Sequence, residues 1–206
     1  MSTLFWIATA SVLSFAAGFC VFALINLRRR PTVVASPAGA EGEGQDLALK
    51  DSVTSLYNRR QLLQRLDENI ARCTRNNEKM AVILWDVDGF VDFNNTFGQS
   101  EGDKLLAKVA ETIRKTLRVY DEAFRCGPDE FCALLVPGDE NVAIEVDRRV
   151  TQIVSTELFQ NDPNYAERRF SLSSGIVYFP GEYQLPEALL HAAGQALYQA
   201  RKSRPS

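Results

Sequence analysis

The sequence predicts an α+β domain in which helices pack on an antiparallel sheet, with one apolar helix before it. Two observations support this fold class. Short apolar runs typical of buried strands alternate with longer segments whose apolar residues recur at helical spacing. Two of the strand-like runs also flank Gly127-Pro128, and a Gly-Pro pair between such runs is typical of a hairpin.

The chain begins with an apolar segment. Residues 4–25 contain no charged side chain, and about 20 helical residues cross the hydrocarbon core of a bilayer. Positive charges follow at Arg28, Arg29 and Arg30, which by the positive-inside bias places the C-terminal side in the cytoplasm. We therefore expect a single-pass anchor in the inner (cytoplasmic) membrane. A cleaved signal peptide is the alternative, but it would carry positive charges before the apolar segment.

The rest of the chain divides into a linker, residues 26–46, and one domain, residues 47–204. The linker joins the basic flank to a stretch rich in Pro, Gly, Ala and Glu, which is typical of a flexible tether. The domain is expected to begin with a helix over 58–76 capped by Asn58, a buried strand over 80–86 and an amphipathic helix over 103–117.

The remaining elements complete a known order. We expect hairpin strands over 122–126 and 130–136, a helix over 140–158, a strand over 170–179 and a last helix over 185–202. Without the first and last helices the order is strand, helix, strand, strand, helix, strand. This is the βαββαβ order of ferredoxin-like folds, in which an antiparallel sheet carries its helices on one face.

The overall charge argues against nucleic acid as a partner. The 206 residues carry a net charge of -3 with a pI near 5.3, so no global basic field attracts a phosphate backbone. The cysteines are Cys20, Cys73, Cys126 and Cys132. They lack the CxxC spacing of metal and redox sites, and we interpret them as reduced core thiols.

Acidic residues occur at two points that the predicted topology brings to one edge of the sheet. Asp86 and Asp88 end the first strand, and Asp129 and Glu130 lie at the hairpin. Converging carboxylates repel one another, and bound divalent cations remove that repulsion. Mg²⁺ held by a few carboxylates and by substrate phosphates suits phosphoryl or nucleotidyl transfer. The alternative is that each pair is an ordinary acidic turn or strand end.

Five stretches, in this order, resemble the GGDEF domain of diguanylate cyclases: DSVTSLYNRR, LWDVDGFVDFNNTFGQSEGDKLL, RVYDEAFRCGPDEFCALL, SLSSGIV and ALYQAR. The resemblance extends from residue 51 to about residue 204 and implies a nucleotidyl-cyclase-type fold. It also implies a homodimer that joins GTP molecules pairwise into cyclic di-GMP, with Mg²⁺ or Mn²⁺ as the cofactor.

The resemblance assigns roles to individual residues. Metal binding falls on Asp86, the Val87 carbonyl and Asp129, and catalysis falls on Asp129 and Glu130. Substrate binding falls on Asn94 and Asp103 for the guanine base, on Gly89 and Phe90 in a phosphate-contacting loop, on Gly127 of the signature, and on Arg201, where the family has a phosphate-binding lysine. Arg118 and Asp121 match the RxxD inhibitory site, where product binds and represses catalysis.

The signature departs from the family pattern because it reads GPDEF, with Pro128 in place of the second glycine. Proline has no N–H, and losing one hydrogen bond to a charged phosphate costs about 1.5–3 kcal/mol, or roughly ten- to a hundredfold in binding or rate. Val91 replaces a usual lysine and Pro205 a usual arginine, while Ser55 and Gly194 replace a usual glycine and aspartate.

These departures leave different functions open. In one the chain is a working membrane-bound cyclase. In another it is an inactive domain that binds cyclic di-GMP at Arg118 and Asp121, or binds GTP, and signals through a partner. The intact acids and base-reading residues favour the enzyme, whereas the altered phosphate contacts favour the receptor. A scaffold that only dimerises is a further alternative.

Overall fold

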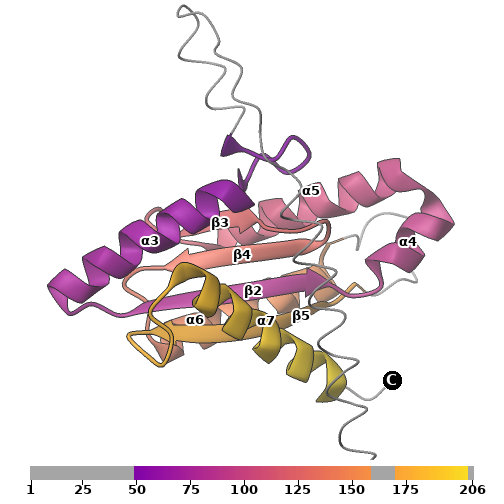
Figure 1. The fold of residues 1–206 in the computed structure, drawn as a ribbon. Coiled ribbons are helices and arrows are strands. Elements are labelled where there is room, and N and C mark those ends of the chain that lie inside the picture. Colours follow the sequence, from indigo (N-terminus) through magenta and orange to yellow (C-terminus); the bar gives the residue numbers. More distant parts are fainter. Residues whose placement is uncertain (1–48, 159–169, 204–206) are drawn as a thin grey trace, which may run out of the picture. The chain divides into compact units, whose positions relative to one another are not determined.

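The computed structural model describes residues 49–158 and 170–203. A five-stranded sheet with the order β1-β3-β4-β2-β5 runs through the domain (Figure 1). The strands are β1 (Tyr57–Asn58), β2 (Met80–Val87), β3 (Glu122–Arg125), β4 (Glu130–Leu135) and β5 (Leu172–Phe179). The helices are α3 (Arg59–Asn76), α4 (Phe90–Phe97), α5 (Gln99–Thr116), α6 (Glu140–Thr156) and α7 (Pro186–Ser203).

The sheet confirms the predicted topology. β2 lies between β4 and β5 and is antiparallel to both, and β3 pairs antiparallel with β4. These four strands form, with α5 and α6, the βαββαβ unit of a ferredoxin-like fold. The remaining strand, β1, is two residues long and runs parallel to β3. The complete sheet is therefore mixed, whereas the sequence predicts a purely antiparallel one.

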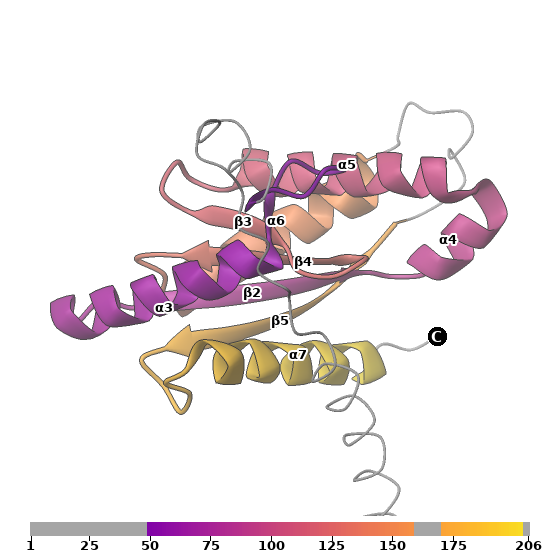
Figure 2. The ribbon, with the colours of Figure 1, turned by 45° about the horizontal axis from the view of Figure 1, so that its top comes forward.

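Helices cover both faces of this sheet. Alternate residues of β2 point to opposite faces, so Ile83 and Trp85 belong to the core under α5 and α6, while Val82 and Leu84 belong to a second core with α3 and α7. Figure 2 shows α5 and α7 on opposite sides of the strands. The prediction of one covered face holds for α5 and α6 alone, because the flanking helices α3 and α7 bury the other face.

Local signals account for some helix boundaries and miss others. Asn58 caps α3, as predicted, by accepting a hydrogen bond from the N–H three residues later at 3.1 Å. The sequence pattern does not predict α4, which lies between Gly89 (φ 70°) and Gly98 (φ 88°). The residues of α4 are mostly weak helix formers, and burial of Phe90 and Phe93 stabilises the helix instead.

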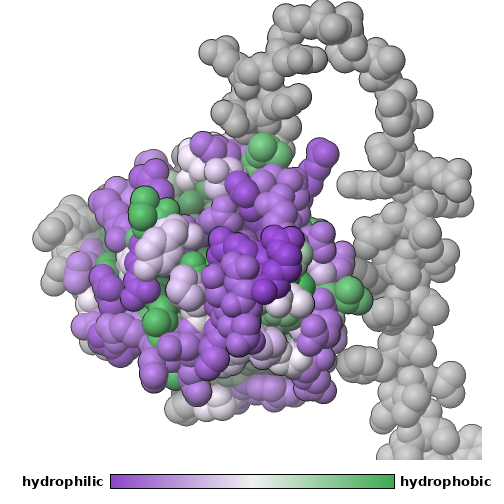
Figure 3. All heavy atoms as spheres, turned by 90° about the vertical axis from the view of Figure 1, so that its left-hand side faces the viewer, coloured by the Kyte–Doolittle hydropathy of each residue, from purple (hydrophilic) through white to green (hydrophobic). Residues whose placement is uncertain are grey.

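The predicted anchor, residues 4–25, and the linker, residues 26–46, lie outside the described residues. Within the described ranges no helix is both long and apolar enough to cross a membrane. On the face shown in Figure 3, hydrophobic residues of the described part are scattered among hydrophilic ones. Three of the four cysteines are buried free thiols, as predicted, and Cys20 lies outside the described residues.

Candidate active site

The first acid of the candidate site, Asp86, lies near the end of β2 and has only 6% of its surface exposed. Its side chain points to the α3 and α7 face, because it continues the alternation of Val82 and Leu84 along the strand. In the sheet register Asp86 lies opposite Glu130 of β4 on one side and Ser173 of β5 on the other. The register therefore places the carboxylates of Asp86 and Glu130 on one face.

The hairpin brings Asp129 to the same end of β2, where the Val87 N–H donates to the Asp129 carbonyl at 3.1 Å. The acids act on one another there. Burial, and after it the charge of Asp129, raise the pKa of Asp86 to about 6, with smaller contributions in the same direction from Glu130 and Asp88. The structure thus brings the two ends of the predicted acidic site together.

The hairpin turn forms with proline at its tip. The N–H groups of Cys126 and Gly127 both donate to the Glu130 carbonyl, at 2.9 and 3.3 Å, and Pro128 is exposed. Gly127 lies beneath the Glu130 side chain, and a Cβ atom on this glycine would clash with the Glu130 carboxylate. The retained glycine therefore leaves the room that the Glu130 side chain occupies.

Arg201, in the last turn of α7, carries positive charge to these acids. Its Nη2 and Nη1 donate to Oδ1 and Oδ2 of Asp86 at 2.6 and 3.1 Å, and its Nε lies 3.5 Å from Asp88 Oδ1. Asp88 also accepts hydrogen bonds from the hydroxyls of Ser171 and Ser173 at 2.6 and 2.7 Å. The sequence analysis missed both serines, although their two-residue spacing in a predicted strand places them on one face.

A second arginine braces the hairpin. Arg125 donates to the carbonyls of Gly127 at 3.3 Å and Pro128 at 2.6 Å, and to Asp51 Oδ1 at 2.9 Å. Asp51 also accepts from the N–H and hydroxyl of Thr54, which closes a turn at the start of the domain. Burial raises the pKa of Asp51, but these hydrogen bonds outweigh it and lower the pKa. The sequence analysis did not identify this brace, because Asp51 and Arg125 are 74 residues apart.

The residues assigned to phosphate and base lie on α4 and the start of α5. Gly89 precedes α4 with open space on the side where a Cβ would project, and Phe90 is buried beneath it. Asn94 packs its carboxamide against Gly102, the neighbour of Asp103, and a Cβ on Gly102 would clash with Asn94 Oδ1. That oxygen is buried and has no hydrogen-bond partner among the described residues. Asn94 therefore keeps a buried, unsatisfied acceptor close to Asp103.

The RVYD stretch forms a closed turn between α5 and β3. The Arg118 N–H donates to the Asp121 carboxylate at 3.0 Å, and the Asp121 N–H donates back to the Arg118 carbonyl at 3.1 Å. The Arg118 guanidinium donates to the Tyr120 hydroxyl at 3.1 Å. Burial raises the pKa of Asp121, and the Arg118 N–H and charge oppose this. The RVYD turn precedes β3, and the hairpin with its acids follows β3. The RVYD turn and the acidic site therefore lie at opposite ends of that strand.

The acids fit a divalent cation by donor type. No group of three or more His, Cys, Asp or Glu side chains in residues 49–158 and 170–203 is arranged to hold a metal. The expected ligand set needs fewer side chains, because it combines the carboxylates of Asp86 and Asp129 with the Val87 carbonyl. Oxygen ligands of this kind suit Mg²⁺ and Mn²⁺. The Arg201 guanidinium on Asp86 also shows that this end of the sheet accommodates a cation.

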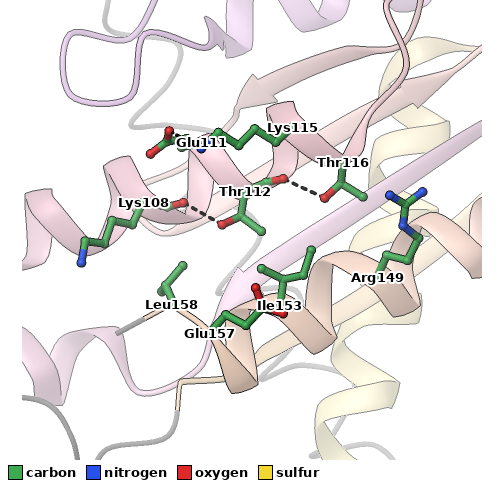
Figure 4. Close-up of a pocket in the computed structure, with 9 residues that line it drawn as sticks. All are labelled: Lys108, Glu111, Thr112, Lys115, Thr116, Arg149, Ile153, Glu157 and Leu158. Atoms are coloured by element: carbon green, nitrogen blue, oxygen red, sulfur yellow. Dashed lines mark hydrogen bonds and ion pairs between the residues drawn. The ribbon is translucent and has the colours of Figure 1, made fainter. Parts of the chain in front are cut away.

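A separate cavity of about 400 Å³ lies between α5 and α6. Figure 4 shows its lining side chains on these two helices and just after α6, including Lys108, Lys115 and Arg149. The hydroxyls of Thr112 and Thr116 donate to carbonyls one turn earlier in α5. Because α5 and α6 cover the face opposite to the Asp86 side chain, this cavity is not part of the acidic site.

Comparison with known proteins decides the family. The sequence model of the family described as "Diguanylate cyclase, GGDEF domain" matches residues 48–205. The chain belongs to the GGDEF family. Its GGDEF domain includes the acidic site, Asn94, Asp103 and the RVYD turn described above.

The GGDEF domain resembles parts of longer proteins. The chain is 36% identical, over 85% of its length, to the bifunctional diguanylate cyclase/cyclic di-GMP phosphodiesterase MucR of Pseudomonas aeruginosa, of which it covers 25%. It is 31% identical over 77% of its length to the response regulator PleD of Caulobacter vibrioides, and 33% identical over 74% to the diguanylate cyclase DosC of Escherichia coli. It spans 35% of PleD and 33% of DosC, so only about a quarter to a third of each of these relatives is represented.

Solved structures show the same fold. A sensory box/GGDEF family protein of Caulobacter crescentus superposes with a TM-score of 0.69 at 30% identity, covering 76% of this chain and 99% of that one. The GGDEF domain of DgcB from the same organism, solved in complex with c-di-GMP, gives a TM-score of 0.69 at 25% identity, covering 75% of this chain and 91% of that one. The fold of the GGDEF domain is therefore shared by both.

Proposed function

We propose that the chain is a membrane-anchored diguanylate cyclase that condenses two GTP molecules into cyclic di-GMP. The observation that supports this most is the meeting of Asp86, Asp129 and Glu130 at one end of the sheet of a GGDEF domain. The relatives MucR and DosC carry the name of this activity. Asp86 comes from β2, and Asp129 and Glu130 come from the hairpin at the start of β4.

The acids and Arg201 handle the phosphates in this proposal. Asp86, Asp129 and the Val87 carbonyl hold Mg²⁺ or Mn²⁺, and the bound ion supplies positive charge for phosphate binding and for charge developing during transfer. In this proposal Glu130, which is the register partner of Asp86, accepts the proton of the attacking hydroxyl. Arg201 provides a fork-shaped donor for the phosphate oxygens.

The loops and α4 position the nucleotide. Gly89 and Phe90 present backbone N–H groups at the start of a helix, where anions bind favourably, and Gly127 lets the signature turn approach the phosphates. Asn94 and Asp103 pair with the edge of guanine. In a homodimer each domain holds one GTP, so that the 3′-hydroxyl of one attacks the α-phosphate of the other and releases pyrophosphate.

Pro128 weakens this activity without abolishing the turn. The turn closes through backbone bonds that do not need an N–H at this position. The phosphate contact of that N–H is lost, and we expect a cost of about ten- to a hundredfold in rate. The decisive experiment incubates the full-length chain with GTP and Mn²⁺ and measures cyclic di-GMP, with Pro128→Gly in parallel. We expect product from both and more from the glycine variant. Product from Pro128→Gly alone would show that the natural chain is no cyclase.

The inactive receptor is the second candidate, and the RVYD turn favours it. Arg118 is exposed, and its guanidinium donates to the Tyr120 hydroxyl, while the Asp121 carboxylate accepts from the Arg118 N–H. The Arg118 guanidinium is therefore accessible to a ligand while Asp121 holds the turn. Equilibrium binding of cyclic di-GMP to the wild type and to Arg118→Ala tests this site independently of turnover. Binding that is equal in both proteins would remove the RVYD turn from consideration.

Recognition of guanine can be tested through Gly102. A methyl group on this glycine would push the Asn94 carboxamide away, and displacing the far end of a side chain leaves the fold intact. We expect Gly102→Ala to weaken GTP binding about tenfold, measured by isothermal titration with a non-hydrolysable analogue. Gly194→Ala is the matched control, because this helical glycine has open space around it. Equal binding by both variants would exclude Asn94 as a base contact.

The anchor belongs to the proposal as well. Residues 4–25 form the membrane helix, and Arg28 to Arg30 keep the GGDEF domain in the cytoplasm. Cell fractionation of the full chain and of a variant lacking residues 4–25 tests this. We expect the full chain in the membrane fraction and the truncated chain in the soluble one. A full chain that sheds these residues on maturation would identify a signal peptide instead.

A further inference from the structure

Arg201 and Asp86 form a closed pair. Both terminal nitrogens of the guanidinium donate to the two carboxylate oxygens, at 2.6 and 3.1 Å. The Asp86 side chain is 9% exposed, whereas that of Arg201 is 42% exposed. The pair therefore has a buried, fixed member on the central strand and a partly solvated member near the end of α7.

Both oxygens of Asp86 are used by this fork. A divalent cation coordinated by Asp86 needs at least one of the same oxygens, at about 2.0–2.2 Å for ions of this size. A guanidinium in its present position would then hold positive charge directly beside the ion. Metal binding and the Arg201 fork therefore compete at Asp86, because both bring positive charge to the same two oxygens.

We propose that Arg201 is a resident counter-ion of Asp86, which divalent cations must displace, and that the released guanidinium then turns to the phosphates of GTP. This proposal rests on the proposed function, because it takes Asp86 as a metal ligand. It adds that the metal and the nucleotide bind cooperatively, since GTP offers Arg201 an anionic partner in exchange for the one it loses.

The neighbouring contacts allow Arg201 to leave. Its second contact, from Nε to Asp88, is long at 3.5 Å, and Asp88 keeps the hydroxyls of Ser171 and Ser173 when that contact opens. Asp86 itself faces the negative charges of Asp129, Glu130 and Asp88. Without Arg201, a cation must replace it to balance them. A divalent cation thus takes the place of the Arg201 guanidinium at the buried carboxylate of Asp86.

The test measures Mn²⁺ binding to the full-length chain by the electron paramagnetic resonance signal of the free ion, without nucleotide. We expect Arg201→Gln to bind Mn²⁺ about tenfold more tightly than the wild type, because the competing cation is gone. The same variant should bind a non-hydrolysable GTP analogue more weakly. Saturating analogue should tighten Mn²⁺ binding in the wild type and do so less in Arg201→Gln.

The matched control is Lys202→Gln, which removes one positive charge from the adjacent residue. The Lys202 ammonium lies 4.7 Å from the centre of the Tyr198 ring. We expect its Mn²⁺ affinity to stay near that of the wild type. An equal gain in Mn²⁺ affinity in Arg201→Gln and Lys202→Gln would mean that net charge alone causes the effect, and it would overturn the proposal. Circular dichroism confirms folding, and Arg201→Lys, which cannot form the fork, should shift Mn²⁺ affinity in the same direction by less.

The outcomes separate this proposal from the proposed function. Unchanged or weaker Mn²⁺ binding by Arg201→Gln, with binding abolished in Asp86→Asn, overturns the counter-ion exchange and leaves the metal site in place. Mn²⁺ binding that is the same in wild type, Arg201→Gln and Asp86→Asn overturns both, because Asp86 then is no ligand. Opposite changes in the affinity for Mn²⁺ and for the GTP analogue support the exchange.

Discussion

The acidic end of β2 and the RVYD turn are built in opposite ways. At the acidic end, Asp86 meets Arg201, which is 115 residues away, and Arg125 joins the hairpin to Asp51 across 74 residues. The RVYD turn is closed by hydrogen bonds between Arg118 and Asp121, three residues apart. At the acidic end, the charges of Asp129, Glu130 and Asp88 repel that of the buried Asp86, and an arginine from a distant segment balances them. The RVYD turn depends on hydrogen bonds between near neighbours in the sequence. The acidic end should therefore respond far more strongly to change.

The largest effect is expected from Asp86→Asn. The substitution keeps the shape of the side chain and removes the charge that a divalent ion and Arg201 both need. We expect cyclase activity to fall at least about a hundredfold, the size seen when one group stabilising transition-state charge is lost. Measured production of cyclic di-GMP at saturating Mn²⁺ checks this, and circular dichroism verifies the fold. Activity within threefold of the wild type would mean that Asp86 is no metal ligand.

The pH dependence of stability is the next effect in size. Burial and then Asp129 raise the pKa of Asp86 to about 6 from an ordinary value of 3.8. Because the folded-state pKa is raised, the stabilising contribution of Asp86 is present below about pH 4 and is lost as the pH rises through about 6. We expect the free energy of unfolding, measured with urea in the absence of divalent ions, to fall between pH 4 and pH 7. The fall should be about 2 kcal/mol larger for the wild type than for Asp86→Asn.

Mg²⁺ provides the control for that measurement. A bound ion compensates the charge of Asp86, so the excess loss of stability at pH 7 should shrink when Mg²⁺ is added to the wild type. Asp86→Asn should show little response to Mg²⁺. Identical pH profiles for the two proteins would mean that Asp86 titrates normally.

Asp121→Asn tests the local turn. Asparagine keeps an oxygen that can accept from the Arg118 N–H, so we expect the turn and the folding stability to change little. Loss of the charge should weaken inhibition by cyclic di-GMP about tenfold, the cost of one hydrogen bond to a charged group. Initial rates with added product measure this. A fall in uninhibited activity comparable to that of Asp86→Asn would contradict the separation of the two sites.

The smallest effect is expected at Ser55, in the turn that Asp51 closes. Ser55 has φ 58°, a left-handed conformation that costs a non-glycine residue about 1–2 kcal/mol. Glycine relieves that cost and loses about 0.5–1 kcal/mol through its flexibility, so Ser55→Gly should stabilise the domain by about 0.5–1 kcal/mol. Ser52→Gly, in the same turn, is the control and should destabilise it. Thermal unfolding of both variants shows whether each substitution stabilises or destabilises the domain.

The sequence predicts regular elements better than short or irregular ones. Apolar residues at helical spacing located α5, and continuous apolar runs located β2 and the hairpin strands, because buried residues follow the period of a helix or fill a buried strand. The sequence pattern missed α4, whose residues are weak helix formers between two glycines, and β1, which is two residues long. It also missed that α3 and α7 cover the second face, since both faces of a central strand read as one apolar run.

The same division applies to the site. The order of the motifs picked out the candidate acids, the candidate base contacts and the RVYD turn, and the family comparison agrees with the domain they define. No local pattern indicated that Arg201 donates two hydrogen bonds to Asp86. Nor did any indicate that Arg125 links the Gly127-Pro128 turn to Asp51. A long cationic side chain reaches whichever acid the packing presents, and sequence spacing does not specify that choice.

The sequence by itself determined the βαββαβ order, the family and the chemical type of each candidate ligand, because these depend on periodicity and on residue identity. Only the tertiary structure decided which charges face one another. Asp86 is paired with Arg201 and set beside Glu130 and Ser173 because strand register and the position of α7 place them there. Electrostatic energy depends on distance and burial, and both are properties of the folded chain.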